Sequence, residues 1–126
     1  LQYTTEQMYV SFNYNNEKFI VGGVYLPPNS PIQSYDSYSS TVENLVSGYS
    51  THSFIFCGDF NLPNINWSND NLGIMYSVTT GNRTHPIPET FAFLNFYQIN
   101  SVFNNFNSML DLIFTNLNLF KVNVVH

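Results

Sequence analysis

The chain has 126 residues and a formal net charge of −5; 44% of its residues are hydrophobic and only 9% are charged. This length predicts one domain or part of one, and the apolar content excludes intrinsic disorder. The three basic residues, Lys18, Arg83 and Lys121, are too few to form a basic nucleic-acid-binding surface within this chain. No apolar run approaches the roughly 18 residues of a membrane span, so the sequence predicts no membrane partner.

The first elements predicted along the chain are two strands. Residues Glu6–Tyr14 alternate weakly, the pair Asn15-Asn16 is typical of a turn, and Lys18–Leu26 is a strongly apolar run. This order predicts a β-hairpin that leads into a buried strand. The pair Gly22-Gly23 inside the second strand predicts a bulge or a close backbone approach.

A loop, a short helix and a third strand are expected next. Residues 29–40 are rich in Ser, Pro, Asn and Tyr, which predicts a surface loop. Apolar residues then recur at helical spacing from Val42 to Tyr49, with Ser39, Ser40 and Thr41 as candidate caps. The run SFIFCGDF, residues 53–60, reads as an apolar strand that ends in polar residues.

The remaining half of the sequence has less periodicity. Residues 62–88 predict a long irregular loop, and Pro88-Glu89-Thr90 is typical of the first turn of a helix. The inner face of that helix would carry Phe91, Leu94 and either Tyr97 or Gln98. Three strands are predicted to follow, over Ile99–Phe103, Met109–Thr115 and Phe120–Val125. The order β-β-α-β-α-β-β-β indicates a mixed α/β arrangement with helices on sheet faces.

Polar residues at strand ends are the candidate site. Asp59 and Asn61 are two positions apart, so a straight strand would place both on one face, where a carboxylate orients water and an amide donates to an anionic oxygen. Asp111 lies in an apolar run, and a buried carboxylate needs a His, Arg or metal partner. The alternatives are structural: a lone Asp at a strand end often serves a turn, and Tyr25 can be packing.

Three ordered segments carry a resemblance to a known family. VYLPPNS at residues 24–30, GDFNLPNINW at residues 58–67 and SMLDLIFTN at residues 108–116 resemble motifs of the endonuclease/exonuclease/phosphatase family, which has the deoxyribonuclease I-like fold. Within that family the sequence is most similar to the endonuclease domain of non-LTR retrotransposons. The resemblance covers roughly residues 20 to 118.

The resemblance implies a fold and a chemistry. The expected fold is α/β of the α+β type, a partial two-sheet β-sandwich flanked by helices, and the expected enzyme is an Mg²⁺-dependent phosphodiesterase that nicks DNA. Asp59 would align or deprotonate the attacking water, Asn61 would hold a phosphate oxygen, Asp111 would orient a catalytic His, and Tyr25 would contact the scissile phosphate. The implied partners are DNA and a downstream reverse transcriptase domain, inside the cell and in the nucleus.

The chain departs from the family pattern at both ends. The strand with the metal-binding Glu would lie before Leu1, and the closing Ser-Asp-His motif would lie beyond His126. We therefore expect residues 1–126 to be a single partial domain, truncated at both ends, whose principal Mg²⁺ ligands lie outside this chain. Such a fragment should be inactive alone and should show an unpaired apolar sheet edge.

Two alternative functions stay open at this point. A phosphatase of the same fold, acting on a small or lipid phosphoester, would tolerate an acidic surface better. A non-catalytic β-rich glycan-binding module would suit the low charge and the many Asn, Ser and Tyr residues. The nuclease hypothesis makes a sharper structural prediction, namely that Tyr25, Asp59, Asn61 and Asp111 share one cleft.

Overall fold

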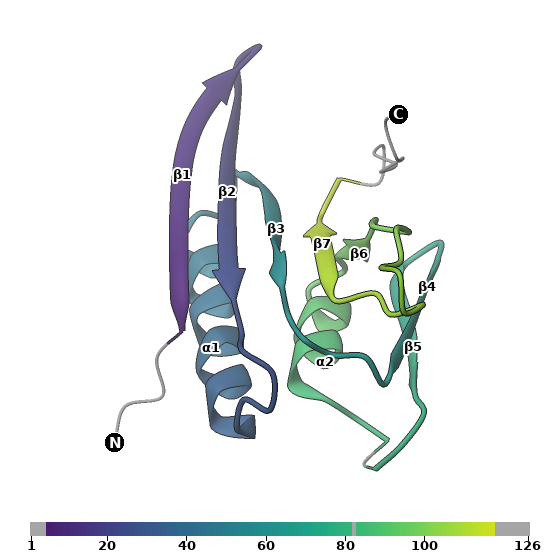
Figure 1. Cartoon of the computed structure of the whole chain (residues 1–126). Coiled ribbons are helices and arrows are strands. Elements are labelled where there is room, and N and C mark those ends of the chain that lie inside the picture. The colour runs from purple at the N-terminus through teal and green to yellow at the C-terminus, as the bar shows by residue number, and fades with distance from the viewer. Residues whose placement is uncertain (1–4, 82, 118–126) are drawn as a thin grey trace.

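A computed structural model of the chain describes residues 5–81 and 83–117, which form two sheets and two helices (Figure 1). The larger sheet has the strand order β1-β2-β3-β7-β6, and β4 pairs with β5 in the smaller sheet. The strands are β1 (Glu6–Tyr14), β2 (Glu17–Tyr25), β3 (Ser53–Asp59), β4 (Ile65–Asp70), β5 (Gly73–Val78), β6 (Tyr97–Gln98) and β7 (Asp111–Thr115). The helices are α1 (Ile32–Gly48) and α2 (Pro86–Phe93). The expected α+β class is confirmed at this level.

The predicted hairpin is present. Asn15 and Asn16 both have positive φ, 50° and 64°, which suits a two-residue hairpin turn between right-twisted strands. β1 and β2 pair without interruption over their whole length, so β2 contains no bulge. The alternative of a close backbone approach was also wrong: the nearest atoms to an added Cβ at Gly22 belong to side chains, with Cε1 of the Tyr9 ring 2.4 Å away, and a Cβ at Gly23 would meet nothing within 4 Å.

Helix α1 begins ten residues earlier than the sequence indicated. The segment predicted as a loop is helical from Ile32, and Pro31 is its N-cap, so the candidate caps Ser39 to Thr41 lie inside the helix instead. The buried face of α1 consists of Ser34, Tyr35, Tyr38, Ser39 and Val42. The residues that recur at helical spacing on this face are therefore mostly Tyr and Ser, and a search for aliphatic residues at that spacing does not detect the first half of the helix.

The prediction of a long irregular loop over residues 62–88 was also wrong, because these residues contain the hairpin β4–β5. Oδ1 of Asp70 accepts hydrogen bonds from the backbone N–H groups of Leu72 and Gly73, at 2.8 Å and 3.1 Å, which fixes the turn. Helix α2 begins at Pro86, after His85 as its N-cap. It ends at Phe93, so Leu94 and Tyr97 lie outside the helix.

The last part of the described chain has fewer strands than expected. The strand predicted over Ile99–Phe103 is absent there, and β6 instead forms a short antiparallel pair with β7 over residues 97–98. The strand predicted from Met109 begins at Asp111. The one predicted over Phe120–Val125 lies outside the described residues.

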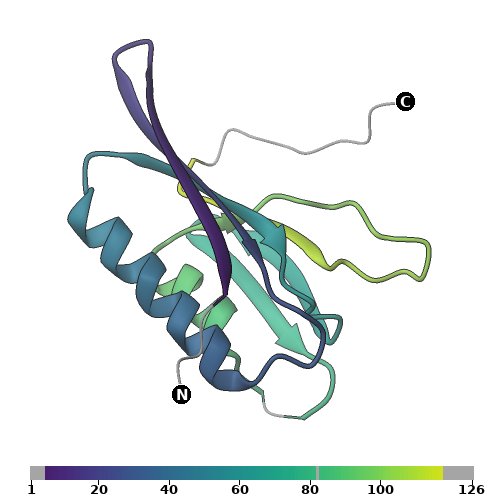
Figure 2. The ribbon, with the colours of Figure 1, turned by 60° about the vertical axis from the view of Figure 1, so that its left-hand side comes forward.

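The core lies on one face of the large sheet. Both helices cover this face (Figure 2), and Trp67 of β4 contacts Phe114 of β7 there at 5.4 Å between ring centroids. Aromatic rings dominate the packing, and the Phe91 and Phe114 rings stack with centroids 3.9 Å apart. Neither α1 nor α2, the helices of the described residues, is long and apolar enough to cross a membrane.

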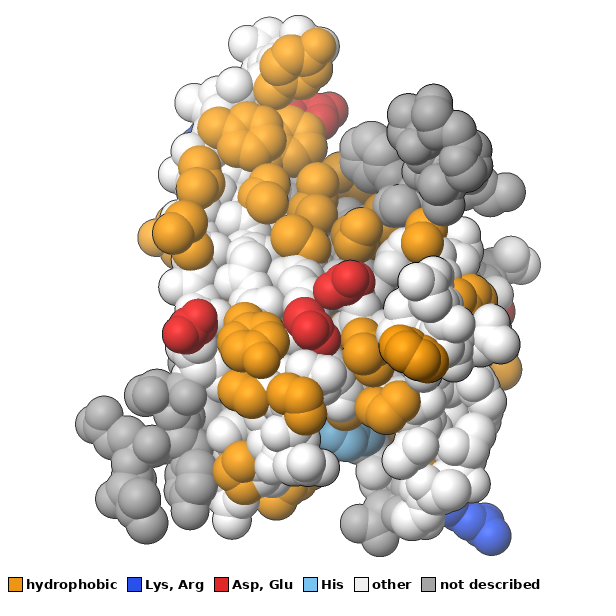
Figure 3. Space-filling model, viewed as in Figure 1, with side chains coloured by type: hydrophobic (Ala, Val, Ile, Leu, Met, Phe, Trp, Pro, Cys, Tyr) orange, Lys and Arg blue, Asp and Glu red, His pale blue; other side chains and the backbone are white. Residues whose placement is uncertain are grey.

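The opposite face of the large sheet, which we call the open face, has no element of the described chain packed over it. Its side chains alternate with those of the core along each strand, and Figure 3 shows a broad apolar area on it. On the edge strand β1, Met8 is 73% exposed, Val10 55% and Phe12 44%. The expected apolar edge strand is thus observed.

Candidate active site

Three of the four predicted site residues lie in one row across the open face. Tyr25 of β2 is the register partner of Asp59 of β3, and Asp59 is in turn the register partner of Asp111 of β7. Glu6 of β1 pairs with Tyr25 on the other side and extends the row. Residues directly opposite one another on neighbouring strands present their side chains to the same face. The fold therefore gathers a phenol and three carboxylates, although they are distant in sequence.

Gly58 explains why the row can form at this point. It has φ +154°, and a Cβ at this position would lie 1.9 Å from the carbonyl oxygen of Val24. Only a residue without a side chain allows β3 to lie this close to β2 just before Asp59. The glycine of the Gly-Asp pair thus has a direct structural role beside the candidate catalytic residue.

Asp59 is half-buried and is held by its own turn. Its Oδ1 accepts a hydrogen bond from the backbone N–H of Asn61 at 3.1 Å. Burial raises the pKa of the Asp59 carboxyl, the hydrogen bond from Asn61 lowers it, and the neighbouring Asp111 carboxylate raises it again. The net direction is upward, so Asp59 is a stronger base than an ordinary aspartate.

Asn61 does not follow the strand geometry expected from its spacing. β3 ends at Asp59, and Asn61 has φ 49°, in the left-handed region that Asn tolerates. Its Nδ2 donates to the carbonyl oxygen of Leu26 at 2.6 Å. Because the chain turns here, Asn61 is adjacent to Asp59 without sharing one face with it.

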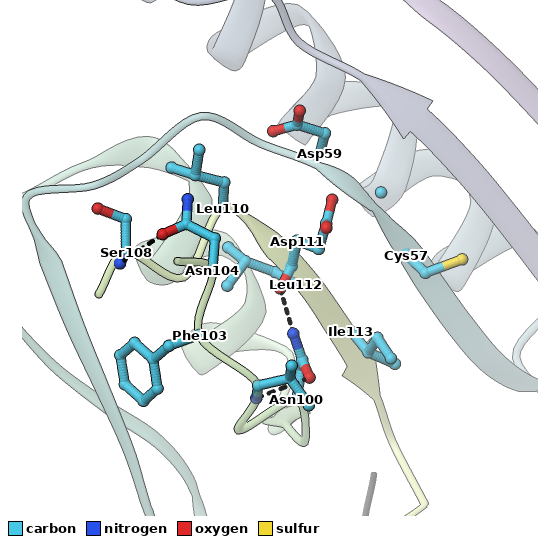
Figure 4. Close-up of a pocket in the computed structure, with 12 residues that line it drawn as sticks. Cys57, Asp59, Asn100, Phe103, Asn104, Ser108, Leu110, Asp111, Leu112 and Ile113 are labelled. Carbon is cyan, nitrogen blue, oxygen red and sulfur yellow. Dashed lines mark hydrogen bonds between the residues drawn. The ribbon is translucent and has the colours of Figure 1, made fainter. Parts of the chain in front are cut away.

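A hollow of about 540 Å³ lies beside the two aspartates (Figure 4). Asp59 and Asp111 line it together with Asn100, Asn104 and Ser108 from the segment that precedes β7. Tyr25 and Asn61 do not line it, so the prediction of one cleft shared by all four residues was wrong. The aspartate pair is the part of that prediction that holds.

Asp111 is exposed, contrary to the expectation of a buried carboxylate. It is the first residue of β7 and faces the open side, whereas its neighbour Leu112 faces the core. Alternation along a strand separates the two environments, so apolar neighbours in sequence did not imply burial. A charged Asp111 therefore needs no compensating partner for stability.

Two buried amides, which sequence analysis missed, fix the backbone of Asp111. The Asn100 Nδ2 donates to the Asp111 carbonyl oxygen at 2.5 Å. Gln98 Oε1 accepts from the N–H groups of Asn100 and Ile113, at 2.8 Å and 3.2 Å. Gln98 and Asn100 are only 5% and 8% exposed. Their i, i+2 spacing before an apolar run is the one signal the sequence offered.

The charge of the hollow suits a cation. Among the described residues that line it, the two charged ones are both aspartates and none is Lys or Arg. Carboxylate oxygens are the ligands that Mg²⁺ prefers, with one or two carboxylates and several waters in its shell. Asp59 and Asp111 fit that donor type, although the described residues contain no group of three or more His, Cys, Asp or Glu that could hold a metal.

Comparison with known proteins identifies a family for the chain. A family model described as endonuclease-reverse transcriptase matches residues 19–126. The chain belongs to the endonuclease-reverse transcriptase family. This match confirms the resemblance to the endonuclease/exonuclease/phosphatase group and to retrotransposon endonucleases, and places the chain among hydrolase-type nucleases at family level. No curated protein and no solved structure matches the chain.

Proposed function

We propose that this chain is part of a DNA-nicking endonuclease domain of a non-LTR retrotransposon, with Asp59 and Asp111 at its reaction centre. The observation that carries the proposal is the register pairing of these two aspartates on the open face of the sheet. Asp59 directly follows Gly58, in a chain that matches a family model described as endonuclease-reverse transcriptase. DNA is the proposed substrate, and a reverse transcriptase domain is the proposed covalent partner.

Asp59 is the proposed residue that positions and activates the attacking water. It is half-buried, and burial with the adjacent Asp111 raises its pKa, which makes its carboxylate a better proton acceptor. The N–H of Asn61 holds Oδ1 and leaves Oδ2 to meet the water. A nucleophile held in this way needs little reorganisation before attack on phosphorus.

Asn61 and Tyr25 are proposed to contact the phosphate. Asn61 uses one N–H of its amide on Leu26, so the second N–H is available to an anionic oxygen. Tyr25 is 43% exposed beside Asp59, where its hydroxyl can donate to the phosphate. Neutral donors of this kind stabilise charge that develops on the equatorial oxygens.

Asp111 is proposed to orient a histidine supplied from outside the described residues. Its backbone is fixed by Asn100, and its exposed carboxylate has room for an imidazole partner. When bound, Mg²⁺ would neutralise charge on the phosphate oxygens. Asp59 and Asp111 are the oxygen donors of this chain that could join its coordination shell.

The open face suggests that a second sheet completes the fold. Its exposed apolar side chains on β1 and half-buried ones on β2, β3 and β7 form a surface of the kind that a second sheet covers in a β-sandwich. We propose that residues outside the described part of the chain supply this second layer. The metal-binding carboxylate and the histidine partner of Asp111 would come with it, so these 126 residues alone should be inactive.

The test uses the full open reading frame that contains these residues and the chain alone. We expect the longer protein to nick supercoiled plasmid with Mg²⁺ and to stop when the metal is chelated, whereas the chain alone should not nick. Asp59→Asn should lower the rate by about 10²–10⁴-fold, and Asn61→Ala by about 10²–10³-fold. The control Asp36→Asn, on the exposed surface of α1, should leave the rate unchanged.

Two results would contradict the proposal. Nicking that survives Asp59→Asn would remove the site assignment even if the family assignment stands. Hydrolysis of a small phosphomonoester without any nicking would favour a phosphatase of the same fold.

A further inference from the structure

A second hollow begins where the proposed reaction centre ends. It has a volume of about 250 Å³, and Asn61 is its nearest lining residue to Asp59 in the chain. The two hollows share no lining residue. The short segment from Asp59 to Asn61 nevertheless connects them, because Asp59 lines the first hollow and Asn61 lines the second. Four parts of the fold line the second hollow: the start of α1, residues 61–65, the end of β5 and the segment just before α2.

The walls of this hollow are apolar inside and polar at the rim. Leu62 and Ile65 are 8% and 6% exposed and provide apolar surface. The polar lining residues are Asn61, Asn64, Thr80, Thr84 and His85. None of the lining residues is Lys, Arg, Asp or Glu, so the hollow offers hydrogen bonds without a formal charge.

His85 is the most informative of the polar groups. Its Nδ1 accepts the backbone N–H of Ile87 at 3.1 Å, so the ring hydrogen lies on Nε2. The ring packs edge-on against Tyr35 with centroids 4.7 Å apart, which fixes its plane. Burial lowers its pKa to about 4, which keeps the ring neutral near pH 7. Nε2–H has no hydrogen-bond partner in residues 5–81 and 83–117, so this donor is available.

We infer that this hollow is a subsite for the base of the nucleotide next to the scissile phosphate. This inference rests on the proposed function, since it takes Asp59 and Asn61 as the place of the phosphate. A base is flat, uncharged and edged with donors and acceptors, which matches apolar walls with a neutral polar rim. The volume lies below the roughly 300–1,000 Å³ of ordinary ligand pockets, which limits the occupant to one ring system. A second phosphate would find no cation here.

The test measures binding of isolated 2′-deoxynucleosides to the whole chain by ligand-observed NMR. We expect dissociation constants in the millimolar range, as is usual for ligands of this size. Deoxyribose 5-phosphate, which has the sugar and phosphate but no base, should not compete. A preference among the four nucleosides would identify the base that the hollow selects.

Two matched variants localise the binding. Asn64 and Asn66 are both exposed and lie on either side of Ile65, but only Asn64 lines the hollow. Asn64→Trp should fill it and weaken nucleoside binding by at least about tenfold, whereas Asn66→Trp should bind as the wild type does. His85→Asp keeps an acceptor for the α2 cap but removes the N–H donor. It should weaken binding about 3–10-fold, the effect of one hydrogen bond.

The outcomes separate this inference from the proposed function. Nucleoside binding that is absent, unchanged by Asn64→Trp or matched by deoxyribose 5-phosphate overturns the base subsite, even if nicking depends on Asp59. If binding follows the variants as stated but the protein of the full open reading frame does not nick DNA with Mg²⁺, the hollow still binds nucleosides and the nuclease proposal is removed. Asp59→Asn should leave nucleoside binding unchanged, because Asp59 does not line this hollow.

Discussion

The two faces of the large sheet differ in what their side chains do. Along β3, Phe54 and Phe56 turn to the core and are 1% and 0% exposed, whereas Cys57 and Asp59, which follow them, face the open side. The core face is filled with aromatic rings that contact α2 and β4. The open face carries exposed apolar residues and the carboxylate row. One set of strands therefore supports stability on one side and the candidate chemistry on the other.

This division has a physical consequence for substitutions. The free energy of folding comes mainly from apolar area and close packing, and these are concentrated on the core face. Carboxylates held at strand ends contribute little to that packing and can be changed without creating a cavity. Stability and activity should therefore respond to different residues of the same strand.

The largest effect on stability is expected from Phe114→Ala on the core face. Phe114 is fully buried, stacks on Phe91 and contacts Trp67 and Phe60 edge-on. Removing the ring should lower the free energy of unfolding by about 3–5 kcal/mol, as large-to-small substitutions of buried Phe do. Chemical denaturation monitored by circular dichroism measures the change.

Phe12→Ala is the matched control on the open face. The Phe12 ring is 44% exposed and stacks on Phe19 within the same hairpin. Its removal should cost about 1 kcal/mol or less. A loss as large as that of Phe114→Ala would show that the open face contributes to stability as much as the core face, which would break the comparison.

Removing a single hydroxyl from a tyrosine on each face compares the two faces more finely. Tyr35 is buried, and its hydroxyl donates to the carbonyl oxygen of Phe60 at 2.8 Å. Tyr35→Phe leaves that carbonyl without this donor and should lower the free energy of unfolding by about 1–2 kcal/mol. Tyr25→Phe removes an exposed hydroxyl from the open face and should leave the unfolding midpoint in urea unchanged. Equal shifts in the two variants would show that burial does not distinguish these hydroxyls.

The parts of the fold that the sequence predicted are those with dense apolar runs. Residues 18–26 and 53–60 each form a strand near their predicted bounds, because a strand buried on one face and half-buried on the other needs apolar residues at most positions. The Gly-Asp pair at the end of β3 was likewise found from sequence, through its place after an apolar run and its resemblance to a family motif. The structure adds that only glycine fits against Val24 there. Here local pattern and tertiary packing agree.

The parts that were missed depend on contacts between distant residues. β4 alternates apolar residues with Asn and Ser, a weak signal, and it forms a hairpin with β5 because Trp67 and Ile74 pack onto the core. The site was found only in part for the same reason. Asn61 leaves the strand face through a positive φ, and Asn100 holds Asp111 across 11 positions of sequence. Residue spacing does not show the positive φ of Asn61, and it shows the contact to Asp111 only through the i, i+2 spacing of Gln98 and Asn100.

Among the buried groups, the smallest expected effect is the pH dependence of stability that His85 contributes. His85 has a pKa lowered to about 4 by burial, partly offset by the nearby Asp36, against an ordinary value of 6.5. The unfolded chain therefore binds a proton at this residue more readily than the folded chain does. Its contribution to stability is complete above pH 6.5 and is lost as the pH falls towards about 4. Because the ring is only partly buried and water screens it, we expect a loss of about 1 kcal/mol.

Urea unfolding of the wild type and of His85→Asn at a series of pH values isolates this contribution. Asn keeps an acceptor for the α2 cap and does not titrate. The variant therefore serves as the reference that shows how stability changes with pH through every other titratable group of the chain. The wild type should gain stability relative to the variant as the pH rises from about 4 to 6.5, with no further gain above. The raised pKa of Asp59 works in the opposite direction but is common to both proteins and cancels. If the difference in stability between the wild type and His85→Asn does not change with pH, the folded chain accepts a proton on His85 as easily as the unfolded chain does. The His85 ring would then not be buried enough to lower its pKa.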